Sequence, residues 1–100
     1  MRPNINQMKK LQQQVAKIQE ELGNETVEAT VGGGVVTVTM NGHQQVVAVK
    51  IAPEVIDPSD PQMLEDLLTA AFNEAVEKVQ ELISKRMGAL TGGLGLPGFM

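Results

Sequence analysis

The first 19 residues of this chain carry the side chains best suited to binding a polyanion. The segment has four basic residues and no acidic residue, although the whole chain has 12 Asp and Glu against 8 Lys and Arg. The four are Arg2, Lys9, Lys10 and Lys17. Residues 20–83 then have a net charge of −10, and Lys85 and Arg86 give residues 84–100 a charge of +2. Basic patches on an acidic body are a feature that a nucleic-acid-binding protein can use.

The same basic residues also fit a simpler role. Polar faces of coiled-coil-like helices are often rich in Lys and Gln, which keeps them soluble. Lys85 and Arg86 would also complement the dipole of a helix that ends near them. Charge alone therefore leaves both a polyanion-binding and a solubilising interpretation open.

Residues able to act as nucleophiles, bases or metal ligands do not form a catalytic pattern. The single histidine, His43, lies in a predicted turn, and the chain has neither a second histidine nor a cysteine to complete a metal cluster or a triad. Ser59 and Ser84 lack the Gly-x-Ser-x-Gly context of a nucleophile elbow. The sequence therefore predicts a protein that is not an enzyme, with no cofactor, no metal and no small-molecule substrate.

Length and composition indicate the class of protein. The chain has 100 residues, of which 42 % are apolar, and this predicts one small domain with a thin core. The absence of cysteine excludes disulfides and fits a reducing cytoplasm. No apolar run approaches the ~20 residues of a membrane helix. We therefore expect a cytoplasmic protein without a membrane partner.

Residues 4–22 have the spacing of an amphipathic helix with a narrow apolar stripe. Apolar residues recur at alternating intervals of three and four, which is the pattern of a coiled-coil seam. The seam residues are Met8, Leu11, Val15, Ile18 and Leu22. Such a helix is about 28 Å long, and its narrow stripe predicts an arm that projects and packs on one side only.

The middle of the chain changes to a period of two and is rich in β-branched residues. Residues 26–31, 35–40 and 46–51 alternate as strands do. A run of three glycines links the first two segments, and Asn41-Gly42 is a strong hairpin signal before the third. These features predict a three-stranded antiparallel meander.

A second helix is expected over residues 61–87. Asp60 followed by Pro61 is typical of a helix start, and Gly88 offers a stop. Residues 91–100 are rich in glycine, which predicts a flexible tail. The predicted fold is α+β, with the order α-β-β-β-α in two layers, as a single domain over residues 1–90.

The predicted sheet has apolar residues on both faces. One face is expected to pack against the helices. The other face carries Val35, Val46 and Ala48, and a sheet that is apolar on both sides is usually covered on both. Chains this small also tend to gain stability by self-association. We therefore predict a homodimer that uses these three residues.

Three long stretches of the sequence resemble one known family. They are "MKKLQQQVAKIQEEL", "GGGVVTVTMNGHQQVVAVKIAPEVID" and "MLEDLLTAAFNEAVEKVQELISKRMGALTGGLGLPG". Together they are similar to the YbaB/EbfC family of bacterial nucleoid-associated proteins over nearly the whole chain. The resemblance implies an α-β-β-β-α fold and tight homodimers with projecting helical arms. It also implies binding of double-stranded DNA with low sequence selectivity, altered DNA conformation, and a role in nucleoid organisation and gene expression.

The resemblance also implies where DNA would bind. Family members contact DNA with the first helix and with the end of the last helix, which are the two basic segments of this chain. The matching residues are Arg2, Lys9, Lys10, Gln13, Lys17, Lys85 and Arg86. A rival hypothesis is a protein-interaction module, which would use either the seam of the first helix or the apolar residues of the tail.

Overall fold

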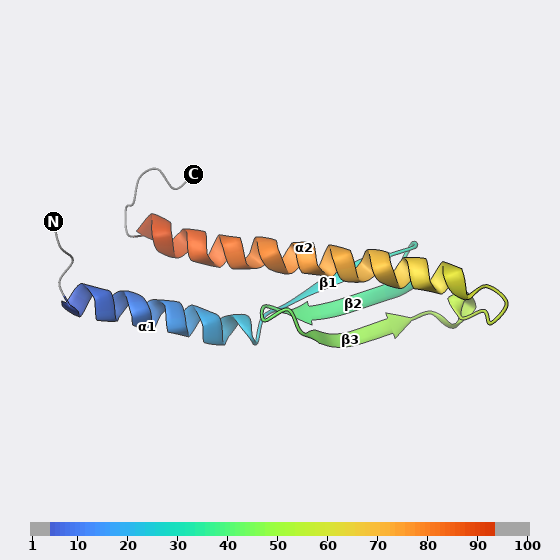
Figure 1. The fold of residues 1–100 in the computed structure, drawn as a ribbon, viewed down its shortest axis with the longest axis horizontal. Helices are drawn as coiled ribbons and strands as arrows, with labels where there is room; N and C mark the ends of the chain where they lie inside the picture. Colours follow the sequence, from blue (N-terminus) through green and yellow to red (C-terminus); the bar gives the residue numbers. More distant parts are fainter. Residues whose placement is uncertain (1–4, 94–100) are drawn as a thin grey trace.

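The computed structural model describes residues 5–93, as one helix, three strands, a short 3₁₀ helix and a second, longer helix (Figure 1). These elements are α1 (Ile5–Leu22), β1 (Thr26–Val31), β2 (Val36–Asn41), β3 (Val46–Ile51), η1 (Pro53–Val55) and α2 (Pro61–Gly93). The predicted α-β-β-β-α order is therefore confirmed. Residues 94–100 of the predicted tail lie outside the described residues.

The strands form an open antiparallel sheet in the order β1-β2-β3. Three glycines with positive φ, from 66° to 101°, make the turn between β1 and β2. Asn41 organises the next turn, because its buried side-chain oxygen accepts the backbone N–H groups of His43 and Gln45 at 2.9 and 3.1 Å. The pairing of β2 with β3 shifts between Thr39 and Met40, where a bulge interrupts the alternation.

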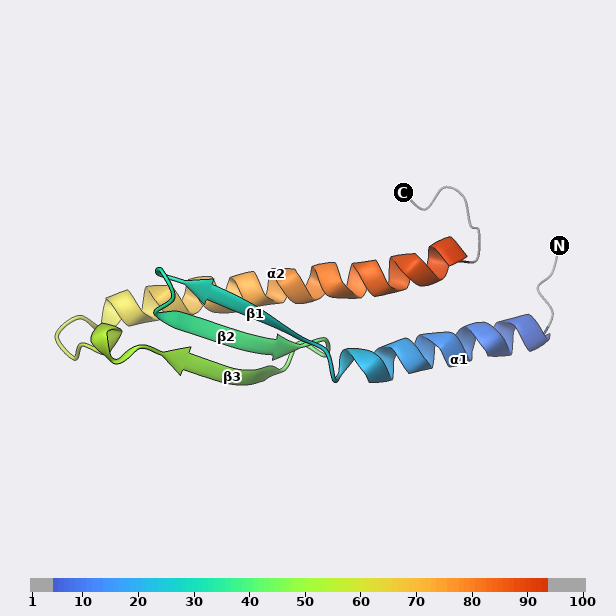
Figure 2. The same ribbon diagram turned by 180° about the vertical axis from the view of Figure 1, so that it is seen from behind.

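Helix α2 forms the second layer and covers β1 and β2 (Figure 2). Asp60 caps its first turn, with the Met63 N–H donating to the Asp60 carboxylate at 3.3 Å, and Pro61 is its first residue. Its sheet-facing stripe contains small residues that are completely buried. The buried core consists of Ala29, Val36, Val38, Met40, Val55, Ala71, Ala75 and Val79.

Helix α2 is much longer than the strands it covers. Its 33 residues span about 50 Å, whereas a strand of six residues spans about 20 Å. The helix also passes Gly88, where the sequence predicted its end, and continues to Gly93. One glycine inside a long helix costs only about 1 kcal/mol, and half-buried Leu90 beyond it extends the apolar stripe. The second half of α2 therefore projects past the sheet.

Helix α1 lies antiparallel to this projecting half of α2, and the two form one end of a molecule that measures 66 × 25 × 16 Å (Figure 1). The expectation that both helices cover the sheet was wrong, because α1 extends away from the sheet rather than over it (Figure 2). The 18 residues of α1 make an arm about 27 Å long. Of the two long helices, α2 is thus the one that covers the sheet.

The turn between β2 and β3 holds the C-terminal end of α1. The Gly42 N–H donates to the Leu22 carbonyl at 2.8 Å, and His43 Nε2 lies 2.6 Å from the Gln19 carbonyl oxygen. The N–H groups of Gly23 and Asn24 bond the carbonyls of Glu20 and Glu21. All four terminal carbonyls, which have no partner within a helix, are therefore satisfied.

We expect Gly42→Ala to lower the free energy of unfolding by about 1–3 kcal/mol, because the added Cβ would lie 2.7 Å from Leu22 Cβ and against the Leu22 carbonyl. Gly88→Ala is the control, since nothing lies within 4 Å of its added Cβ and helical alanine is about 0.5–1 kcal/mol better than glycine. Urea unfolding at one fixed protein concentration measures both. Equal effects of the same sign would contradict the described contact between the turn and α1.

Candidate nucleic-acid interface

The basic residues of α1 share one face of the helix. At 100° per residue, Lys9, Gln13, Lys17 and Lys10 fall within an arc of about 100°. All four side chains are exposed. The centre of this arc lies about 170° from the centre of the apolar seam, so the two are on opposite sides of the arm. The lysines can therefore meet a polyanion while the seam packs against protein. We call these four residues the α1 basic face.

The seam of α1 becomes more exposed toward the tip of the arm. Leu22 is buried, Val15 and Ile18 are half-buried, and Met8 is 49 % exposed. Ile5, at the tip, is 70 % exposed. Within residues 5–93, the arm is therefore packed at its base, where Leu22 lies against the turn at Gly42, and its seam is more exposed at its basic end.

The structure gives Arg86 a different environment from the α1 lysines. Its Nη2 lies 2.5 Å from Glu21 Oε1, and its Nη1 donates to Glu25 Oε2. The hydrogen bond to Glu21 is the main cause that raises the pKa of Arg86 above its usual value. The guanidinium group of Arg86 is therefore already paired with two carboxylates of its own chain.

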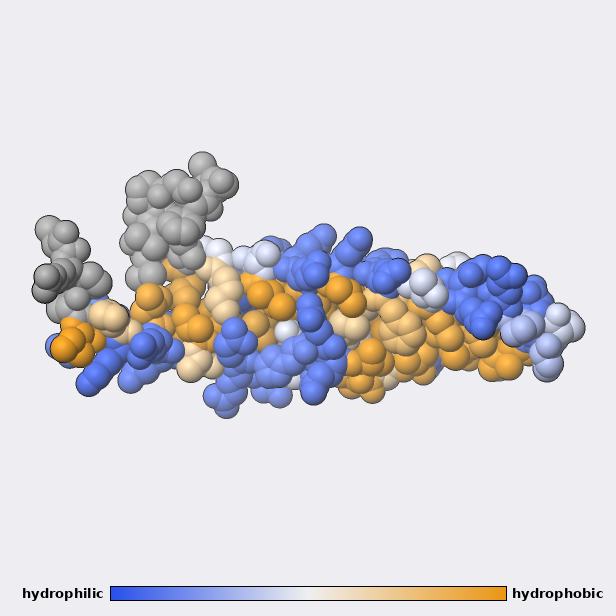
Figure 3. Space-filling model, viewed as in Figure 1, coloured by the Kyte–Doolittle hydropathy of each residue, from blue (hydrophilic) through white to orange (hydrophobic). Residues whose placement is uncertain are grey.

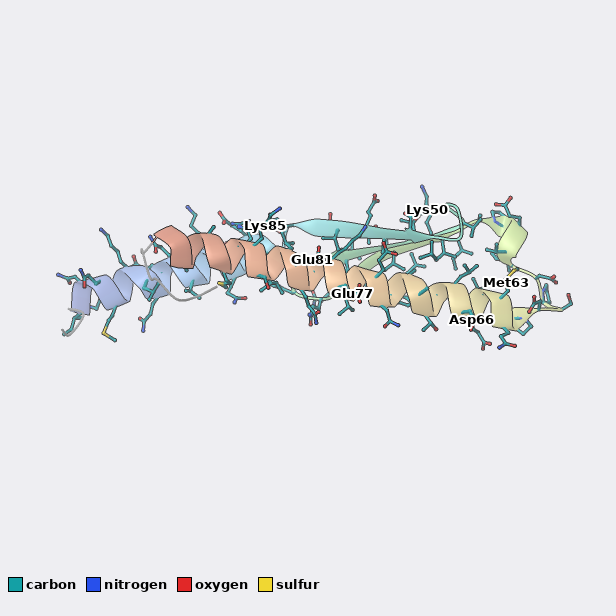
Figure 4. All side chains as sticks on the ribbon, turned by 90° about the horizontal axis from the view of Figure 1, so that it is seen from above. Lys50, Met63, Asp66, Glu77, Glu81 and Lys85 are labelled. Carbon is teal, nitrogen blue, oxygen red and sulfur yellow. The ribbon has the colours of Figure 1, made fainter. Side chains whose placement is uncertain are left out.

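Lys85 lies on an acidic face of α2. Glu81 is one turn before it and Glu77 is two turns before it, and Figure 4 shows the three residues following one another along the helix. The acidic residues on this face lower the positive potential around Lys85. The end of α2 is thus not the simple basic patch that its sequence indicated.

The predicted DNA-binding residues that the structure describes fall into two groups. The α1 basic face brings together Lys9, Lys10, Gln13 and Lys17, whereas Lys85 and Arg86 lie on α2 beside carboxylates. Arg2 lies outside the described residues. Sequence reasoning placed His43 in a turn but missed its contact with α1, because its bond to the Gln19 carbonyl joins segments 24 residues apart and leaves no local signal.

The three residues predicted to form a dimer surface do not share one face. Val35 lies in the turn before β2 and packs against the core. Because of the bulge, Val46 pairs with Met40 and Ala48 pairs with Thr39. Met40 and Thr39 are adjacent on β2, so their side chains point to opposite faces of the sheet. Strict alternation was therefore wrong at this point. The dimer surface itself stays a prediction.

Apolar surface does gather on the sheet side of the molecule, and it includes Val46 of the three predicted residues. Figure 3 shows it over β3 and beneath the start of α2. Val47 on β3 is 57 % exposed, and Ile56 beyond η1 is 55 % exposed. The other exposed apolar residues of this region are Val46, Val49 and Met63. We call these five residues the β3 apolar surface.

Other kinds of site find little support in the described part of the chain. No group of three His, Cys, Asp or Glu in residues 5–93 is arranged to hold a metal ion. None of the described helices has the length and hydrophobicity to cross a bilayer. The remaining lysines are Lys50, exposed on β3, and Lys78, whose ammonium group donates to the Glu28 carbonyl at 2.7 Å.

Comparison with known proteins identifies the relatives of this architecture. The model of the YbaB/EbfC DNA-binding family matches residues 1–94. The chain belongs to the YbaB/EbfC DNA-binding family. The resemblance found in the sequence is thereby confirmed, and the match includes α1, the sheet and all the described length of α2.

Bacterial relatives of this family member are similar along most of their length. A nucleoid-associated protein of Moorella thermoacetica is 52 % identical over 99 residues, which cover 99 % of this chain and 95 % of the relative. A nucleoid-associated protein of Pelotomaculum thermopropionicum is 51 % identical over 94 residues, covering 94 % of this chain and 90 % of the relative.

A solved structure has the same fold. The crystal structure of an uncharacterized protein from Helicobacter pylori matches with a TM-score of 0.77, covering 90 % of this chain and 99 % of that chain. The sequences are 18 % identical, so this likeness concerns the fold alone. The α-β-β-β-α arrangement therefore does not depend on most of the residues of this chain.

We expect an amine-reactive reagent to modify Lys17 and Lys10 faster than Lys78 in the free protein. Lys78 is held by the Glu28 carbonyl and lies 3.5 Å from Glu74, whereas the α1 lysines are exposed. Mass spectrometry after brief acetylation measures the rates. A Lys78 that reacts as fast as Lys17 would contradict the described environments.

Proposed function

We propose that this chain is a nucleoid-associated protein whose homodimer grips double-stranded DNA with the α1 basic faces of its two arms. The observation that carries this proposal is the exposed arc of Lys9, Lys10, Gln13 and Lys17 on a helix that projects from an acidic body. Membership of a DNA-binding family supports it. The names of the bacterial relatives support a location at the nucleoid.

The grip would rest on phosphate contacts. Lysine ammonium groups bind phosphate as point charges, and the Gln13 amide adds a neutral donor. Two copies would present six α1 lysines. The negative charge of residues 20–83 repels DNA from the rest of the molecule, so the arms would be the only favourable approach.

Sequence selectivity would be low. Arginine is the side chain that most often reads guanine in the major groove, and the chain has two, of which Arg86 is paired with carboxylates. Selectivity would instead come from DNA shape and from the distance between the two arms. Two arms held at a fixed distance would also change the path of the DNA between them, and so affect nucleoid organisation and gene expression.

The β3 apolar surface supports the dimer. Three of its five residues, Val46, Val47 and Val49, lie on an edge strand that α2 leaves uncovered. Apolar edge strands are liable to pair with another chain unless they are protected. A second copy of this chain would bury Val47, Val49 and their neighbours. The same contact would set the distance between the two α1 arms.

The exposed tip of the α1 seam favours a second candidate, a protein-interaction module. Met8 and Leu11 are exposed and could dock a partner helix. The apolar tail residues of this hypothesis lie outside the described residues. A partner that stays bound after nuclease treatment would favour this module, whereas loss of the partner would favour DNA binding.

We expect fluorescence anisotropy with a labelled duplex to give steeply salt-dependent binding. Contact with about 4–8 phosphates gives a slope of log K against log salt of roughly −4 to −7. Lys9→Gln/Lys10→Gln should weaken binding at low salt and flatten the slope, because it removes phosphate contacts.

The matched control is Gln62→Glu/Asn73→Glu, which lowers the net charge by the same two units at exposed positions of α2 over the sheet. It should keep the slope of the unmodified protein. Equal weakening by both variants would mean that overall charge, and not the α1 basic face, decides binding. Absence of binding at low salt would sink the proposal.

We expect sedimentation at micromolar concentration to give twice the 10.7 kDa chain mass. Val47→Asp should produce monomers, because it places a charge on the β3 apolar surface. Ile5→Asp is the control, since it makes the same change at the exposed tip of α1. A monomeric unmodified protein, or a Val47→Asp protein that remains dimeric, would overturn this surface.

A further inference from the structure

Arg86 is the one described residue whose ion pairs join α2 both to the end of α1 and to the segment between α1 and β1. It belongs to α2, whereas Glu21 lies in the last turn of α1 and Glu25 lies just before β1. The bonds join residues 65 and 61 positions apart in the sequence. A planar guanidinium that bonds two carboxylates at once fixes direction as well as distance.

The turn between β2 and β3 holds the same end of α1 by a second set of hydrogen bonds. His43 Nε2 reaches the Gln19 carbonyl at 2.6 Å, and the Gly42 N–H reaches the Leu22 carbonyl at 2.8 Å. Any Cβ at Gly23 would meet the His43 ring at 2.7 Å, so the turn and the helix end are in close contact. The base of α1 is therefore fixed by α2 and by the turn between β2 and β3.

Within residues 5–93, the tip of α1 is less buried than its base. The seam becomes progressively exposed from Leu22 to Met8, as described above. An arm about 27 Å long moves at its tip by about 5 Å when its base tilts by about 10°. The contacts at the base of α1 therefore determine where Lys9 and Lys10 lie. The ion pairs of Arg86 are among these contacts.

We propose that Arg86 is a positioning residue, which sets the direction of the α1 basic face through Glu21 and Glu25 and does not itself contact DNA phosphate. This inference rests on the proposed DNA binding. To reach a phosphate, the guanidinium would have to leave two carboxylates, and those carboxylates would then repel the same phosphate. This role differs from the DNA contact that the sequence resemblance implied for Arg86.

Two variants of the full chain separate positioning from contact. Arg86→Ala should weaken DNA binding several-fold with an unchanged salt slope, whereas loss of a phosphate contact would flatten the slope by about 0.9 for each contact. Glu21→Gln/Glu25→Gln leaves Arg86 in place and removes two negative charges. It should also weaken binding if these carboxylates hold the arm. It should strengthen binding if Arg86 contacts phosphate. Strengthening, or a flattened slope in Arg86→Ala, would overturn the proposal.

A distance measurement tests the arm without DNA. The chain has no cysteine, so nitroxide labels can be placed at Gln12→Cys on α1 and Gln80→Cys on α2, with labelled chains diluted by unlabelled ones. We expect one narrow distance distribution in the otherwise unmodified protein. Arg86→Ala and Glu21→Gln/Glu25→Gln should broaden it, and Lys10→Gln should not.

The outcomes of the two experiments are distinguishable. A narrow distribution in Arg86→Ala would overturn the positioning role even if DNA binding is weakened. Failure of the unmodified protein to bind DNA would overturn the proposed function, while the distance distribution would still report whether Arg86 holds the arm. Circular dichroism on each variant excludes loss of the fold as the cause of weakened binding.

Discussion

Close packing of α2 on β1 and β2 is the contact on which the rest of the structure depends. Ala71, Ala75 and Val79 recur every four residues and are completely buried against the sheet. Their small side chains let the helix approach the strands, and this fixes its axis. Because α2 is about 30 Å longer than the strands, the remainder has to project beyond them. The projecting half of α2 is therefore a consequence of the unequal lengths of the helix and the strands. It provides the surface beside which α1 lies.

The elements of this fold were predictable because each has a clear local signal. The period of the apolar residues changes from helical to alternating near Gly23, and Asp60-Pro61 marks the start of α2 correctly. The helix end at Gly88 was predicted wrongly, since a single glycine is a weak stop when an apolar stripe continues past it to Leu90. Local signals thus gave the order of elements and most of their bounds.

Long-range contacts left no such signal. The Arg86 ion pairs and the His43 bond join residues that are 24 to 65 positions apart, and the bulge near Met40 changes which side chains of β3 lie beside which residues of β2. The basic segment of α1 was visible in the sequence because its residues are neighbours on one helix. The surroundings of Arg86 were not, because they depend on how two helices meet. Charge counted along the chain therefore did not show that Arg86 lies beside two carboxylates.

The contacts at the base of α1 also have a consequence for cooperativity. Among the described residues, the long-range bonds that hold the base of α1 come from α2 and from a turn that exists only once β2 and β3 are paired. The sheet and α2, in contrast, form their core without any residue of α1. We therefore expect the arm to open and close as a unit of its own, with a free energy smaller than that of global unfolding. The backbone amide hydrogens along α1 would then exchange with solvent through this local opening, at rates that differ from those of the sheet amides.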